Sequence, residues 1–198
     1  MSANVFFVCA VAVQSLWSYD LSRSYERALT ESMPARMATC VEVGQRAADA
    51  GKDWELMISL AFEESRFVPD ARSSAGAVGP MQVLPRYFCP DGVERGCDLI
   101  AAGLDAWQRW YDRTPVGDNR VSQALCHYNS GTTCSRAGRS YAARILGRKE
   151  RFGYRAKHLA GQVSLDRCLN GYNGMIDTPQ WAALAGGWCV WPDGFVNE

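Results

Sequence analysis

The chain has 198 residues, with 21 Lys and Arg against 21 Asp and Glu, so its formal net charge is zero. This length is enough for one domain with a well-formed core and a small appendage. The charge balance argues against a general nucleic-acid-binding protein, which needs a basic excess. Hydrophobic residues make up 47% and charged residues 21%, as is ordinary for a globular protein.

The first segment of the chain is apolar. Residues 5–13 carry no charge, no Lys or Arg precedes them, and the run is too short to span a bilayer. We therefore expect a buried or partner-docking helix here rather than a secretory signal. Residues 21–32 predict an amphipathic helix that ends at Met33-Pro34. Together these features define an N-terminal helical segment over residues 1–35.

Two helices are predicted next. Residues 38–50 repeat apolar side chains at helical spacing, and Gly51 ends the run. Asp53 can cap the following helix, Trp54 to Phe67, because its carboxylate can accept the free N–H groups of the first turn. That helix is apolar on almost every face, which predicts a position at the centre of the domain.

Residues 68–98 hold most of the Pro, Gly and Ser residues, so we expect a loop with short strands. Helices are predicted over Leu99 to Tyr111, Val121 to Tyr128 and Ser140 to Arg151. Residues 159–198 are rich in Gly and Trp, and we interpret them as a C-terminal extension fastened by Cys168 and Cys189.

Cysteine usage indicates an oxidising compartment. An even and high number of cysteines favours disulfides. No C-x-x-C motif occurs, and His127 and His158 do not complete a zinc-binding spacing, so no metal site is predicted. Short Gly-containing loops favour the pairs Cys89–Cys97 and Cys126–Cys134, although connectivity does not follow from sequence alone. The eight cysteines are Cys9, Cys40, Cys89, Cys97, Cys126, Cys134, Cys168 and Cys189.

Glu64 is the main candidate for chemistry. A glutamate near the end of a buried helix loses hydration, which raises its pKa and keeps it protonated near neutral pH. Such an acid can donate a proton to a glycosidic oxygen. The alternative is an ordinary ion-paired or capped glutamate, which is the commoner case. Glu63 is turned about 100° around the helix, so we expect the two carboxylates not to act as a pair.

Other residues carry weaker signals. Gly76 and Gly79 permit positive φ angles, as a simple surface turn also would. Gln82 can bind an amide or a hydroxyl, and Tyr128-Asn129 can place a phenol and an amide in the same cleft, although an exposed Gln and a core Tyr are equally ordinary. Trp107 and Trp110 share a helix face and are more typical of a core than of a sugar platform.

Taken together, these motifs resemble a known family. The segment Glu64-Ser65, Pro69, Ser73, Gly76-Ala77, Gly79, Met81-Gln82 and Pro85 resembles the signature of soluble lytic transglycosylases. Tyr128-Asn129-Ser130-Gly131 is similar to the family's Ala-Tyr-Asn-Ala-Gly motif, and Tyr141 with Arg144-Ile145-Leu146 is similar to its closing helix. The resemblance covers residues 36–155. This sequence departs from the family at Glu63 (commonly Gln), Pro80 (Leu), Leu84 (Met), His127 (Ala) and Ala137 (Glu).

The resemblance implies a goose-lysozyme-like fold, mainly α (α+β) with a small β or loop region, here stabilised by disulfides. It implies cleavage of the MurNAc–GlcNAc β-1,4 bond of peptidoglycan with formation of a 1,6-anhydro ring. By position, Glu64 would be the sole catalytic acid and base. Ser73, Gln82 and Tyr128 would lie in the glycan cleft, and Asn129 would shape it. No cofactor or metal is required.

Residues 36–158 would form this domain, between the N-terminal segment and the extension over 159–198. A hydrolytic muramidase is one alternative, and it needs a second carboxylate, for which Asp70, Asp91 and Asp98 are the nearby candidates. A non-catalytic wall-binding component of a virion or secretion machine is another.

The expected partners are peptidoglycan glycan strands and, in some settings, other virion or secretion-apparatus proteins. Nucleic acid and a stable membrane span are not expected. The expected place of action is outside the cytoplasm, at the bacterial cell wall (periplasm), with delivery in a phage virion or by a secretion apparatus.

Overall fold

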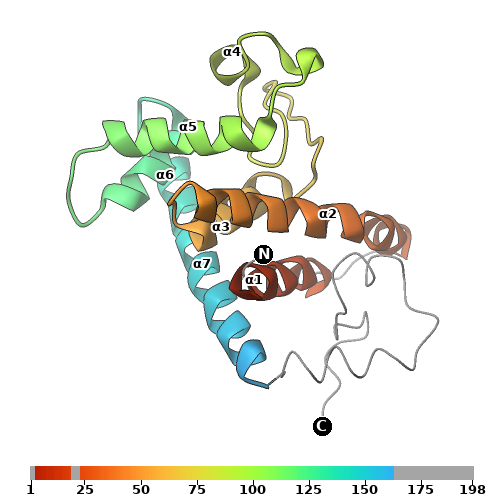
Figure 1. Ribbon diagram of the computed structural model, residues 1–198. Helices are drawn as coiled ribbons and strands as arrows, with labels where there is room; N and C mark the ends of the chain where they lie inside the picture. Colours follow the sequence, from red (N-terminus) through yellow and green to blue (C-terminus); the bar gives the residue numbers. More distant parts are fainter. Residues whose placement is uncertain (1–2, 19–22, 163–198) are drawn as a thin grey trace.

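The computed structural model describes residues 3–18 and 23–162, and the predicted predominance of helix is confirmed there (Figure 1). Its elements are α1 (Ala3–Gln14), the 3-10 helix η1 (Ser15–Ser18), α2 (Arg23–Asp49), α3 (Trp54–Ser65), α4 (Pro85–Phe88), the 3-10 helix η2 (Val93–Arg95), α5 (Leu99–Arg113), α6 (Arg120–Ser130) and α7 (Arg136–Gln162). Most of the predicted C-terminal extension, including Cys168 and Cys189, lies outside the described residues.

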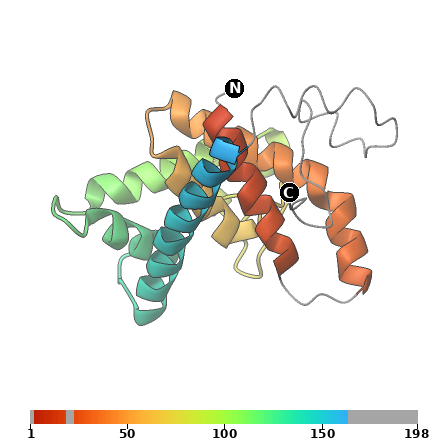
Figure 2. The same ribbon diagram turned by 90° about the horizontal axis from the view of Figure 1, so that it is seen from below.

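The long helix α7 packs against three other helices, α6, α3 and α1. It contacts α6 near its start and packs along α3 and α1 further on, as Figures 1 and 2 show. Helix α2 packs against α1 and α3, and α5 packs against α6. The core between these helices is apolar, and its largest fully buried side chains include Met57, Ile58, Leu60, Phe67, Met81, Leu125 and Ile145. The prediction that α3 is the central buried helix is confirmed.

Helix α2 is continuous, which corrects the predicted break at Met33-Pro34. Pro34 lies inside the helix and cannot donate a backbone hydrogen bond. Leu29 is buried before the proline and Cys40 and Val43 are buried after it, all in the same core. We attribute the continuity to this shared burial, which outweighs a proline penalty of about 3 kcal/mol. Residue 35, the predicted limit of the N-terminal segment, therefore lies within α2.

The N-terminal helix α1 is buried, which confirms the first of the two expectations for residues 5–13, a buried or a partner-docking helix. Val5, Cys9 and Ala12 have no exposed surface. A disulfide joins Cys9 to Cys40 of α2, a pair that the sequence did not predict. Helix α1 and α2 approach closely at Gly44, where an added Cβ would lie 2.6 Å from Cγ1 of Val5 and 2.8 Å from Cδ1 of Ile58.

The segment between α3 and α5 is mostly loop, as predicted, but within the described residues its β structure is limited to two isolated bridges. These bridges join Val78 to Arg72 and to Val83. Val78 and Val83 form a second, small core with Cys89 and with Ala102 and Ala106 of α5. This small core fixes the loop to the helical body.

The two predicted disulfides, Cys89–Cys97 and Cys126–Cys134, are both present. Every cysteine of the described residues is paired. No helix in the described part of the chain combines the length and the hydropathy needed to cross a bilayer.

The close packing at Gly44 gives a test of the α1–α2–α3 contact. Gly44→Ala should lower the free energy of unfolding by about 1–3 kcal/mol, because the new methyl group must displace Val5 and Ile58. Gly147→Ala on α7 is the matched control, since no atom lies within 4 Å of its added Cβ. It should stabilise the protein by up to about 1 kcal/mol through helix propensity. Chemical denaturation measures both, and a neutral Gly44→Ala would contradict the packing.

Candidate active site

Glu64 lies in the last turn of α3, where its side chain is half-buried. The hydroxyl group of Tyr141, which projects from α7, donates a hydrogen bond to Oε1 of Glu64. Tyr141 itself is buried against the main core. The two residues that form this contact are 77 positions apart in the chain. The candidate acid is therefore held between the end of α3 and the first turns of α7.

The surroundings of Glu64 change its acidity. Burial raises the pKa of its carboxyl from 4.5 to about 7. The hydrogen bond from Tyr141 opposes this rise, and the negative charge of Glu63 adds to it. Burial also raises the pKa values of Tyr128 and Tyr141 well above 10, so both phenols are neutral at physiological pH. Glu64 can thus both give and take a proton near neutral pH.

The chain turns sharply after Glu64. Helix α3 ends at Ser65, two residues before the predicted end, because Arg66 and Phe67 have φ angles of 52° and 64°. Such left-handed conformations are unfavourable for residues with side chains. Phe67 is fully buried against the ring of Phe62, and the carbonyl oxygen of Arg66 accepts a hydrogen bond from Arg36 at 2.7 Å. These contacts hold the strained turn beside the acid.

Two side chains hold the following loop against the helices through its backbone. Ser65 Oγ donates to the carbonyl oxygen of Pro80 at 2.8 Å, and the Tyr128 hydroxyl donates to that of Met81 at 2.7 Å. The Met81 side chain is fully buried and fills the space over Gly103 of α5, where an added Cβ would lie 2.5 Å from its sulfur. The loop is therefore fixed at consecutive residues by α3, α6 and α5.

Gln82 is a structural part of this loop. Its φ angle is 49°, and its side-chain Nε2 donates to the carbonyl oxygens of Gly79 at 2.9 Å and Ala71 at 3.1 Å. The amide that the sequence suggested for binding is thus committed, through its nitrogen, to closing the turn.

The remaining predicted residues are Ser73 and Asn129. Ser73 is exposed, and its Oγ accepts a hydrogen bond from the Ala77 N–H at 3.0 Å within its own turn. Asn129 is exposed on α6, directly after Tyr128. Tyr128 lies near enough to Glu64 that the charge of Glu64 contributes to its raised pKa.

Sequence reasoning did not place Tyr141 or Ser65 in the site. Both belong to segments that carry the family resemblance, and this was the signal that could have found them. Trp107 is buried, as expected for a core residue, while Trp110 stacks on His127 with ring centroids 5.7 Å apart.

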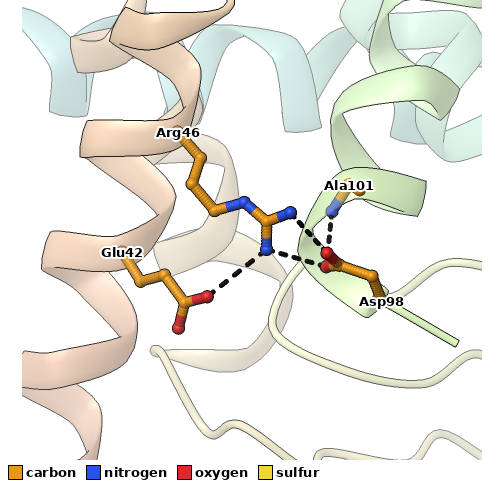
Figure 3. Close-up of polar contacts among 4 residues, drawn as sticks. All are labelled: Glu42, Arg46, Asp98 and Ala101. Carbon is orange, nitrogen blue, oxygen red and sulfur yellow. Dashed lines mark hydrogen bonds and ion pairs between the residues drawn. The ribbon is translucent and has the colours of Figure 1, made fainter. Parts of the chain in front are cut away.

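Two carboxylates that sequence reasoning weighed beside Glu64, Glu63 and Asp98, are bound to arginines. Arg144 and Arg148 bind Glu63. Asp98 caps α5 by accepting from the Ala101 N–H, and it binds Arg46, which also contacts Glu42 (Figure 3). These Arg46 hydrogen bonds hold the pKa of Asp98 below its usual range.

Asp70 and Asp91, the other two candidates, are exposed. No cluster of three His, Cys, Asp or Glu side chains that could hold a metal ion occurs in the described residues. Glu64 is therefore the buried carboxyl group for which this site shows a raised pKa.

The raised pKa of Glu64 has a consequence for stability. The native protein binds this proton up to about pH 7, whereas the unfolded chain releases it near pH 4.5. Stability from this group is thus complete below pH 4.5 and is lost as the pH rises to 7. Glu64→Gln should gain stability relative to wild type over that range, by at most about 3 kcal/mol.

Denaturant unfolding at pH 4.5 and pH 8 measures this difference. The exposed Glu150→Gln on α7 is the control, and it should show the same small effect at both pH values. A Glu64→Gln effect that does not change with pH would contradict the buried-acid description.

The loop contact gives a second test. Tyr128→Phe removes the donor to the Met81 carbonyl and should cost about 1–2 kcal/mol of stability. It should also speed amide hydrogen exchange in residues 79–83, because the loop loses one of its anchors. Tyr154→Phe is the control, since Tyr154 is 69% exposed, and unchanged exchange in the Tyr128 variant would refute the anchoring role.

Comparisons with known proteins identify the family of this chain. The family model described as "Transglycosylase SLT domain" matches residues 43–148, from α2 to α7, a range that includes Glu64 and Tyr141. The membrane-bound lytic murein transglycosylase F of Cellvibrio japonicus (strain Ueda107) is 31% identical over 106 residues, which are 50% of this chain and 20% of that protein.

The chain thus spans about one fifth of the length of this relative. No solved structure gives a significant match. The mostly helical fold agrees with the lysozyme-like fold expected of the matched family. Because the family model covers more than half of the chain, the protein belongs to the transglycosylase SLT domain family.

Proposed function

We propose that this chain is a peptidoglycan lytic transglycosylase that cleaves the MurNAc–GlcNAc β-1,4 bond. The observation that carries the proposal is a single half-buried acid, Glu64, whose pKa of about 7 suits both proton donation and proton removal. Family membership supports it, as does the name of the related protein, which is a lytic murein transglycosylase.

In the first step, protonated Glu64 donates its proton to the glycosidic oxygen, and the bond from that oxygen to C1 of MurNAc breaks. The positive charge that develops at C1 is supported by the N-acetyl oxygen of the same sugar. A second protein carboxylate is then not required, which fits a site in which Glu63 and Asp98 are each bound to arginine.

In the second step, Glu64 is ionised and acts as a base. It removes the proton from the 6-hydroxyl of MurNAc, and that oxygen attacks C1 to close the 1,6-anhydro ring. The Tyr141 hydroxyl, which donates to Glu64 Oε1, stabilises the ionised carboxylate between the two steps. The carboxyl group ends the cycle protonated again.

We propose that Gln82, Tyr128 and Asn129 line the glycan-binding surface with Ser73. Tyr128 and Gln82 would act through the loop that they hold, and the exposed Ser73 and Asn129 would contact the glycan directly. We also propose that residues 36–158 contain the catalytic unit, with α1 packed against it and α2 crossing the limit at residue 35.

The place of action that we propose is the bacterial cell wall, outside the cytoplasm. The disulfides Cys9–Cys40, Cys89–Cys97 and Cys126–Cys134 support an oxidising compartment. Delivery in a phage virion or by a secretion apparatus belongs to the same proposal. Mass spectrometry of purified particles and of periplasm tests it, and detection of the mature chain only in the cytoplasm would contradict it.

The test of the activity is digestion of purified sacculi with wild type and Glu64→Gln. Wild type should release soluble muropeptides that end in 1,6-anhydro-MurNAc. The variant should lose about three orders of magnitude or more of this activity, as expected when the only general acid is removed. Liquid chromatography with mass spectrometry measures the products.

The outcomes separate the candidate functions. Products that end in reducing MurNAc would identify the protein as a hydrolytic muramidase instead of a lytic transglycosylase. Binding to intact sacculi without soluble product would favour a non-catalytic wall-binding component. Full activity of Glu64→Gln would overturn the assignment of the acid, provided that circular dichroism shows the variant to be folded.

A further inference from the structure

The residue before the acid carries an unusual arrangement of charge. Glu63 stands where the family commonly has Gln, and its side chain is only 12% exposed. It binds two arginines of α7. Arg144 Nε donates to Oε1 at 2.6 Å, and Arg148 Nη1 donates to Oε2. Both oxygens of the carboxylate are thus occupied by α7.

The two arginines differ in how strongly solvent screens them. The Arg144 side chain is 52% exposed, whereas that of Arg148 is 14% exposed. The guanidinium of Arg148 also lies over the ring of Phe62, 4.8 Å from its centroid, and Phe62 packs edge-on against Phe152 of α7. Arg148 is therefore held between a carboxylate and an aromatic face, with little access to water, so its interaction with Glu63 is weakly screened.

One face of α7 serves both neighbouring glutamates. Tyr141, Arg144 and Arg148 are spaced by three and four residues, which places them on the same side of the helix. Tyr141 binds Glu64, and the two arginines bind Glu63. Because these contacts lie on one face of α7, the same rotation of α7 about its axis brings the arginines to Glu63 and the Tyr141 hydroxyl to Glu64.

The groups around Glu64 leave Glu63 as the charged neighbour. The phenols Tyr128 of α6 and Tyr141 of α7 are neutral, because burial raises their pKa values. Residues 79–82 of the loop contain no ionisable side chain. Glu63 of α3 is therefore the charged group that adds to the raised pKa of the acid, and the partners of Glu63 are the two arginines of α7.

We propose that Glu63 is a positioning residue for the reaction: clamped by Arg144 and Arg148, it places Tyr141 against Glu64 and sets the charge that the acid experiences. This inference rests on the proposed function only for its activity measurements. The effect of Glu63 on the pKa of Glu64 is expected in the protein without substrate, so it can be measured independently of activity.

The proposal predicts that Glu63→Gln and Arg148→Gln shift the pH profile of activity in opposite directions. In Glu63→Gln, the negative neighbour is lost and Arg148 is left without its partner, so ionised Glu64 is favoured and the basic limb of the pH profile of kcat/KM moves to lower pH. In Arg148→Gln, Glu63 keeps its charge without its buried partner, so the limb moves to higher pH. Each shift should be about one pH unit, which corresponds to about tenfold in the activity ratio above the limb.

Further variants sharpen the test. Arg144→Gln should move the limb in the same direction as Arg148→Gln but less, because solvent screens Arg144. Lys149→Gln removes another α3–α7 ion pair, with Asp53, at the opposite end of α3. This matched control should leave the profile unchanged.

A direct titration makes the test independent of catalysis. The pKa of the Glu64 carboxyl is read by carbon-13 NMR of glutamate-labelled protein, with Glu64→Gln to assign the signal. Opposite shifts in Glu63→Gln and Arg148→Gln support the proposal. Equal losses of activity at all pH values, or shifts of one sign in both, overturn it by pointing to a structural role. If Glu63→Gln does not fold, the two arginine variants must still raise the pKa, Arg148→Gln by more.

The failure of this inference is distinct from that of the proposed function. If wild type releases no anhydro product, the lytic assignment fails, and the NMR titration still decides the role of Glu63. If wild type is active and neither the pH profile nor the NMR titration shifts in the variants, the proposed role of Glu63 is refuted while the lytic assignment stands.

Discussion

Keeping one carboxyl group away from water is the constraint on which the rest of this structure depends. A half-buried carboxylate is costly unless polar partners compensate it. Glu64 receives a hydrogen bond from Tyr141, and burial leaves its pKa at about 7. The protein therefore tolerates an acid that weakens stability as the pH rises. Such a stability cost at a functional group is a common feature of active sites.

Helix α7 holds the acid in place through contacts that run from the start of α3 to its last turn. Lys149 binds Asp53 at the start of α3, Phe152 packs on Phe62 near its end, and Tyr141 meets Glu64 in its last turn. Helix α7 also carries the contacts to α1 and α6. The placement of the acid thus depends on the packing of the entire helical body rather than on the motif around Glu64 alone.

Local patterns were enough to predict much of this arrangement. The helix around Glu64, the loop after it and the pairs Cys89–Cys97 and Cys126–Cys134 all involve residues close in sequence. The features that were missed depend on contacts between distant residues. Tyr141 reaches Glu64 across 77 residues, Cys9 pairs across 31, and Pro34 stays helical because residues on both sides of it share one core. The functional roles of Ser73, Gln82, Tyr128 and Asn129 stay predictions.

The way in which the loop after α3 is held has an evolutionary consequence. Ser65 and Tyr128 bind the carbonyl oxygens of Pro80 and Met81, which belong to the main chain. Every amino acid supplies such an oxygen, so neither anchor requires a particular side chain at these two positions. The unusual proline at position 80 keeps its anchor as fully as a leucine would. Sequence drift in this loop is therefore limited by backbone path and core volume, while the two anchoring residues on the helices are the ones that substitution would disrupt.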